Sequence, residues 1–217
     1  MNFFRDRLIY LASCTKLVLI RAMVFSTFLS DLILSLVSLA MAYRFVGKSS
    51  IPSRSALYGL GIIGISAGLG SIHFLGINTL DSIYRFFVGL SGTVGVPLLG
   101  LAFFHFTFRS LSEKTFFLFI ALAFVLYLAF TYLYPLPIYP TVVGGISMFI
   151  ILISSLVRFP RKSNAAVMGI IGSILFIVAG LVIGTKGSTG SILNVDIFHI
   201  LLAIANYCIA EGIRKLS

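Results

Sequence analysis

The chain has 217 residues, of which 59% are hydrophobic and only 10% are charged, and its mean hydropathy is +1.11. A composition this apolar excludes a soluble globular domain and indicates a polytopic membrane protein. Unpaired backbone groups are costly in hydrocarbon, and the chain lacks the alternating pattern of outer-membrane strands. The spanning elements are therefore expected to be helices of about 20 residues.

The formal net charge is +10. In a soluble protein this would suggest nucleic-acid binding, but here the basic residues lie between apolar runs, where they set orientation and contact anionic headgroups. We therefore expect membrane lipids as partners and no nucleic acid. Cys14 and Cys208 lie far apart without CxxC spacing, so neither a disulfide framework nor a structural zinc module is indicated.

Seven apolar runs are long enough to span a membrane, and polar or helix-breaking segments separate them. The runs lie at roughly 26–46, 56–76, 82–107, 115–134, 141–158, 165–184 and 193–212. The separators include Pro52, the proline-containing segment 134–137 and the Gly/Ser/Thr-rich segment 184–191. The sequence thus predicts an all-α membrane protein, a seven-transmembrane helical bundle, over residues 26–217.

Residues 1–25 form a separate N-terminal segment that carries Arg5, Arg7, Lys16 and Arg21. We predict an interfacial or extra helix here. Two alternatives are a short eighth crossing that turns tightly into the first span and a true start of the protein at Met23.

Basic residues gather after the odd-numbered spans and predict the orientation of the bundle. These residues are Arg44, Lys48, Arg54, Arg109, Lys114, Arg158, Arg161, Lys162, Arg214 and Lys215. The opposite loops contain few basic residues besides Arg85 and Lys186. The excess of positive charge on cytoplasmic loops predicts a cytoplasmic C-terminus and an N-terminus outside. The expected location is a bacterial cytoplasmic (inner) membrane.

Ionisable residues within membrane spans are costly and therefore mark candidate functional positions. Five of them fall at the start of an odd span or the end of an even span: Asp31, His73, Asp81, Asp196 and His199. Consecutive spans run in opposite directions, so all five are predicted to converge on one leaflet, the outer one by the charge rule. His105 and Glu211 fall at the opposite ends of their spans and are expected to be interfacial.

Asp196 and His199 stand three residues apart and share one face of a helix. With His73 from another span they would supply two imidazoles and a carboxylate, the ligand set of a catalytic zinc with a fourth position left for water. Zinc-bound water hydrolyses amides and esters. The pattern therefore favours a zinc-dependent intramembrane hydrolase of a lipid amide or ester.

Neighbouring polar residues provide candidate catalytic partners. Asp81 or Asp31 would act as the general base or orient an imidazole, and Ser71 or Ser66 would be an outer hydrogen-bond partner. The segment 184–191 would lie beside this site and is expected to act as a mobile cover.

Seven spans, a histidine late in span two, an acid soon after it and a polar motif at the start of span seven resemble the superfamily of alkaline ceramidases and progestin/adipoQ receptors. The resemblance implies a zinc-dependent lipid-amide hydrolase, with His73 as the span-two zinc histidine and Asp81 as the acid near span three. His199 would be one histidine of the span-seven HxxxH pair. The other would stand at Val195, and Asp196 is the nearest substitute.

The same residues support hypotheses without catalysis. They would fix helix packing through hydrogen bonds, or they would bind an ion or proton in a carrier or receptor-like bundle. A third alternative is a haem protein with His73 and His199 as axial ligands. Asp81 has a non-catalytic alternative role, a local ion pair with Arg85. For Asp31 the alternative to a catalytic role is helix capping.

Overall fold

The computed structural model describes residues 24–190 and 192–217. Residues 1–23 of the predicted N-terminal segment therefore lie outside the described residues. The first helix is described from Val24 to Tyr43.

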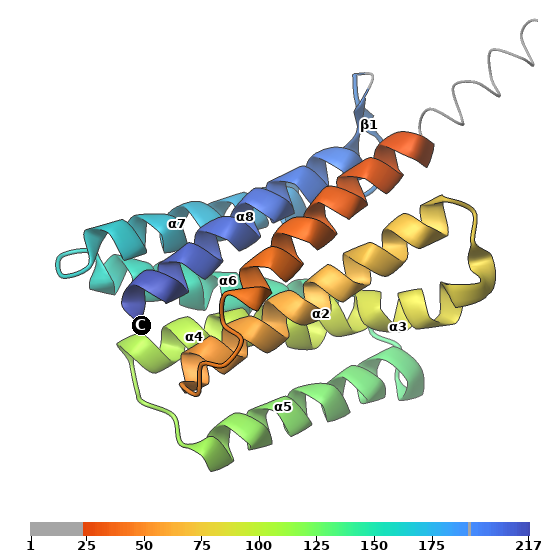
Figure 1. Ribbon diagram of the computed structural model, residues 1–217. Coiled ribbons are helices and arrows are strands. Elements are labelled where there is room, and N and C mark those ends of the chain that lie inside the picture. The colour runs from red at the N-terminus through yellow and green to blue at the C-terminus, as the bar shows by residue number, and fades with distance from the viewer. Residues whose placement is uncertain (1–23, 191) are drawn as a thin grey trace, which may run out of the picture.

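Seven helices in the described part of the chain are long and apolar enough to cross a membrane, which confirms the predicted all-α, seven-helix organisation (Figure 1). They are Val24–Tyr43, Ile51–Phe74, Asp81–Thr107, Glu113–Leu133, Tyr139–Arg158, Ser163–Ile183 and Asn194–Leu216. The helical elements after the first helix are α2 (Ile51–Phe74), η1 (Asn78–Leu80), α3 (Asp81–Leu90), η2 (Ser91–Gly95), α4 (Val96–Thr107), α5 (Glu113–Leu128), η3 (Ala129–Leu133), α6 (Tyr139–Arg158), α7 (Ser163–Ile177), η4 (Val178–Ile183) and α8 (Asn194–Leu216).

Two helix boundaries differ most from the prediction. Helix α2 begins at Ile51 rather than near residue 56, and Pro52 lies in its first turn instead of in the loop. Proline is compatible with a first turn because the N–H that it lacks has no helical partner there. Helix α8 continues to Leu216 rather than ending near residue 212, and Glu211 accepts a 2.7 Å hydrogen bond from Arg214 one turn later.

Three of the spans contain a π-helical turn that the sequence pattern does not indicate. These turns are η2, η3 and η4. A π-helical turn inserts an extra residue into the helical repeat and is often found at functional sites. Two of the three, η2 and η4, border the cavity described below.

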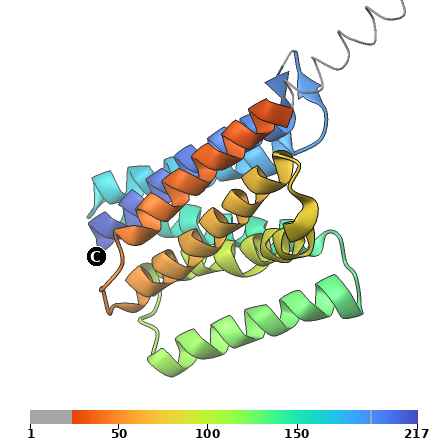
Figure 2. The same cartoon turned by 45° about the vertical axis from the view of Figure 1, so that its right-hand side comes forward.

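The helices pack around a centre from which α5 is set apart. Helix α8 lies beside α7 and the first helix, and α4 packs against α2 and α6 (Figure 1). Helix α5 lies on the outside, next to α3 and η2, as Figure 2 also shows. Buried Phe116 and Tyr127 attach it, and the Tyr127 hydroxyl donates a 2.8 Å hydrogen bond to the carbonyl of Phe86.

Close contact between α2 and η2 depends on glycine. A Cβ atom at Gly59 would lie 2.7 Å from the carbonyl oxygen of Gly95 and 3.0 Å from Leu99 Cδ2. Because the nearest of these atoms belongs to the backbone, it cannot rotate away, and only glycine allows the two helices this separation.

One end of the bundle, here called the basic end, carries the C-terminus and the three loops rich in Lys and Arg. Buried Glu211 forms ion pairs there with Arg44, which directly follows the first helix, and with Arg214. Arg54 at the start of α2 pairs with Glu113 at the start of α5. These contacts tie helix ends together, and the interfacial position expected for Glu211 stays a prediction.

Candidate functional site

At the opposite end, a short hairpin leads into α8. Its strands are β1 (Ser188–Thr189) and β2 (Ile192–Leu193), which pair antiparallel. The Asn194 side chain donates a 2.8 Å hydrogen bond to the carbonyl of Lys186 and accepts a 2.7 Å hydrogen bond from the Thr189 hydroxyl. The segment predicted to be a mobile cover thus includes the first strand of a hairpin that is anchored to the start of α8, and its mobility stays a prediction.

The first turns of α8 join the first helix through a group of polar side chains, here called the Asp31–His199 cluster: Ser26, Ser30, Asp31, Asp196 and His199. The hydroxyls of Ser26 and Ser30 donate to the two carboxylate oxygens of Asp196 at 2.6 and 3.2 Å. Asp31 Oδ1 lies 3.3 Å from His199 Nδ1. Ser30 Oγ also lies 3.2 Å from that nitrogen.

The cluster does not have the geometry of a Ser-His-Asp triad. In a triad the serine and the carboxylate contact different imidazole nitrogens. Here Ser30 and Asp31 both approach Nδ1 of His199. Within the described residues, Nε2 has no hydrogen-bond partner, and His199 lines a cavity.

Asp31 has one carboxylate oxygen without a partner. The residue is 3% exposed, and Oδ2 makes no hydrogen bond within the described residues. This oxygen packs against Gly70 of α2, where an added Cβ would lie 2.5 Å from it and 3.1 Å from the Tyr84 ring. Because the first helix extends back at least to Val24, Asp31 stands in the helix interior, and the alternative of a capping role does not apply.

His73 and Asp81 form a second, more exposed pair. Their Nδ1 and Oδ1 atoms are 2.6 Å apart, and the two side chains are 29% and 32% exposed. The His73 ring stacks on Tyr84 with centroids 5.0 Å apart. Asp81 therefore pairs with His73, and the described residues show no ion pair between Asp81 and Arg85.

The structure does not bring the three predicted zinc ligands together as one group. His73 is engaged by Asp81, whereas Asp196 and His199 belong to the Asp31–His199 cluster. Across residues 24–190 and 192–217, no group of three or more His, Cys, Asp or Glu residues is arranged to hold a metal ion. The zinc site proposed from the sequence therefore stays a prediction.

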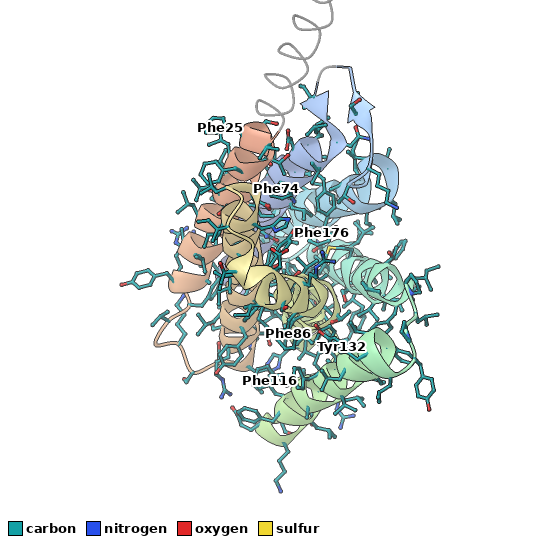
Figure 3. The ribbon with its side chains drawn as sticks, turned by 90° about the vertical axis from the view of Figure 1, so that its right-hand side faces the viewer. Phe25, Phe74, Phe86, Phe116, Tyr132 and Phe176 are labelled. Atoms are coloured by element: carbon teal, nitrogen blue, oxygen red, sulfur yellow. The ribbon has the colours of Figure 1, made fainter. Side chains whose placement is uncertain are left out.

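A cavity of about 580 Å³ lies between the helices at this end. Its polar lining includes Asp31, Ser66, Tyr84 and His199, and most of the remaining wall is apolar. Its described lining contains no Lys or Arg. Figure 3 views the bundle from this end, with the lining residues Phe74 and Phe176 near the middle of the ring of helices. A volume of this size is typical of small-molecule sites, about 300–1,000 Å³.

The remaining candidates have local structural partners. The Ser71 hydroxyl donates a 2.8 Å hydrogen bond to the carbonyl of Gly68 in its own helix, and Ser71 does not line the cavity. His105 Nδ1 accepts a 3.0 Å hydrogen bond from the backbone N–H of Leu111 near the basic end. The catalytic roles predicted for Asp31, Ser71 and Asp81 stay predictions.

Three side chains at this end were not predicted as site residues: Ser26, Ser30 and Tyr84. Ser26 and Ser30 are four residues apart and therefore share a helix face, a spacing that could have marked them. Nothing in the local sequence distinguishes Tyr84 from other aromatic residues, because its importance comes from its position between His73 and the Gly70 contact of Asp31.

Residues 26–217 match one family model, described as "Family of unknown function (DUF6962)". The chain belongs to this family. No curated protein and no solved structure matches it. The match extends over the seven-helix part of the chain and assigns no activity to it. The cavity and the side chains around it are therefore the guide to function.

Proposed function

We propose that this DUF6962 protein is a membrane-embedded binding protein, receptor-like or carrier-like, for a small amphiphile. The polar group of the ligand would bind at Asp31, and its apolar chain would occupy the cavity. The observation that supports this proposal is that Asp31 lines a cavity with mainly apolar walls while its buried Oδ2 has no hydrogen-bond partner within the described residues.

The charge around Asp31 selects the headgroup. A buried carboxylate oxygen without a donor costs free energy, about 1–3 kcal/mol for a polar group and more for a charged one. An N–H or O–H group of a ligand would remove this cost. Asp196 belongs to the same cluster, and the cavity has no described basic residue, so an anionic headgroup would be repelled. The ligand is therefore a cationic or neutral amphiphile with a hydrogen-bond donor.

The proposed orientation follows from the basic end. With its Lys- and Arg-rich loops in the cytoplasm, the cavity lies in the outer half of the bilayer. A ligand would then approach from the outer leaflet or from the medium outside. An enzymatic step is no part of this proposal.

Binding of three ligands with equal chain length tests the headgroup selection. For protein in nanodiscs, we expect dodecylamine to raise the unfolding temperature most, dodecanol less and dodecanoate least. Replacing Asp31 by Asn removes a charge-assisted hydrogen bond of about 1.5–3 kcal/mol and should weaken amine binding by about 10- to 100-fold. Asp81→Asn is the matched control, because Asp81 lies at the same end but is paired with His73.

Equal binding of amine and carboxylate by the wild-type protein would contradict the proposed selection. An Asp31→Asn protein that keeps the full preference for the amine would show that another group binds the head. If Asp81→Asn weakened amine binding as much as Asp31→Asn, the more exposed pair would be the site instead.

The zinc-dependent hydrolase is a second candidate, favoured by the Nε2 atom of His199, which has no hydrogen-bond partner within the described residues. It predicts near-stoichiometric zinc in purified protein, reduced by His199→Ala and by Asp196→Asn, and fatty-acid release that stops on chelation. Amphiphile binding, in contrast, should be unchanged after chelation. Elemental analysis beside the binding assay separates the two candidates.

A further inference from the structure

The wall of the cavity is interrupted between α6 and η4. Helix α7 packs along α6, but its continuation η4 packs against α8 and makes few contacts with α6. Cavity-lining residues on both sides of this gap are exposed, among them Thr141 and Phe149 of α6 and Gly180 and Leu181 of η4. We call this gap the lateral opening.

Three positions at the lateral opening carry no side chain because they are glycines. Gly144 and Gly145 on α6 and Gly180 on η4 all line the cavity, and a Cβ atom added at any of them would meet nothing within 4 Å. Gly172 on α7 is different, because a Cβ there would lie 2.6 Å from Ile209. The glycines of the lateral opening thus border empty space, whereas Gly172 allows close helix packing.

The position of these glycines along their helices sets the depth of the opening. Helix α6 begins at Tyr139, so Gly144 and Gly145 lie about 8–9 Å along its axis, at 1.5 Å per residue. Gly180 stands three residues before the end of η4 at Ile183. In a spanning bundle the opening therefore faces the acyl-chain region just below the headgroups of one leaflet.

A route from the water side would pass the hairpin. There the cavity borders Gly184 and Thr185 at the base of the hairpin. Asn194 anchors this hairpin through its hydrogen bonds to Lys186 and Thr189. A ligand from water would have to pass beside the anchored hairpin, whereas a ligand in the bilayer meets the glycines of the lateral opening.

We infer that the amphiphile reaches the cavity from within the bilayer, through the lateral opening, and moves its polar head inward to Asp31. The ligand is then a single-chain amphiphile dissolved in the membrane, since a cavity of about 580 Å³ suits one chain better than two. This inference rests on the proposed function and adds the route and the source of the ligand.

Substitutions that narrow the lateral opening test the route. In nanodiscs, a long-chain primary amine with a photoreactive diazirine in its chain labels the protein after timed flashes. We expect Gly180→Phe and Gly144→Phe to slow labelling by about tenfold, because they restrict access to the cavity. Gly61→Phe is the matched control: Gly61 also borders open space, but it does not line the cavity. Labelled peptides should include Phe149 or Leu181.

The outcomes separate the route from the function. If Gly180→Phe and Gly144→Phe label at the wild-type rate, the ligand uses another path, and the inference is overturned while the proposed function stands. The proposed function fails if the wild-type protein does not bind dodecylamine and if dodecylamine does not compete with the photoreactive amine for labelling. Slower labelling by Gly61→Phe as well would assign the effect to helix packing and overturn the inference.

Discussion

Replacing Gly59 by leucine is expected to lower the free energy of unfolding by about 2–3 kcal/mol, the upper part of the usual range for overpacking. A Cβ at this position would lie 2.7 Å from the carbonyl oxygen of Gly95, a backbone atom of η2. The clash can be relieved only if α2 and η2 move apart. Such a movement would also disturb the side of the cavity that Ser91 and Gly92 form.

Gly61→Leu is the control for this substitution. It places the same side chain two residues further along α2, where an added Cβ meets nothing within 4 Å. Thermal unfolding in detergent should show a decrease of about 4–12 °C for Gly59→Leu, at about 2–4 °C per kcal/mol, and little change for Gly61→Leu. Equal decreases for both variants would mean that leucine disturbs α2 generally and that the contact with η2 is not the cause.

His199→Ala is expected to destabilise the protein by roughly 3 kcal/mol. His199 Nδ1 lies between Asp31 Oδ1 and the Ser30 hydroxyl, and both Asp31 and Asp196 are buried. Without the imidazole, Asp31 would have two buried oxygens lacking a partner instead of one. Alanine also leaves space between the first helix and α8, which loosens the contact between them.

His73→Ala is the matched comparison, because it removes the other histidine paired with an aspartate at this end. Its pair is 29% and 32% exposed, so Asp81 can be solvated by water or headgroups, and the expected loss is below about 1 kcal/mol. Chemical or thermal unfolding of both variants gives the comparison. A larger loss for His73→Ala would show that the pair with Asp81, rather than the Asp31–His199 cluster, stabilises this end.

The effect of His199→Ala on stability also bears on the proposed function. A cluster that only held the helices together would leave amine binding unchanged once the variant is assayed below its unfolding temperature. The proposal instead expects weaker binding, because His199 fixes the Oδ1 side of Asp31 and thereby orients Oδ2. Stability and binding are therefore separate measurements on the same variant.

The sequence by itself determined the seven helices and the depth of the ionisable residues. Runs of about 20 apolar residues must form helices in hydrocarbon, because all backbone groups have to be paired. Once the spans are counted, their alternating direction places Asp31, Asp81 and Asp196 at one end, where the structure also has them. Glu211 falls at the other end by the same reasoning and is found there with Arg44.

Only the tertiary structure decided which of these residues meet. The span count gives the depth of each residue, but it gives neither the rotation of each helix about its axis nor the identity of the neighbouring helices. In a membrane, moreover, the lipid-facing and core-facing sides of a helix are both apolar. The sequence therefore did not show that His73 pairs with Asp81 while His199 lies against Asp31. The cavity and its lateral opening likewise depend on how α6 and η4 separate, a three-dimensional property that no local pattern encodes.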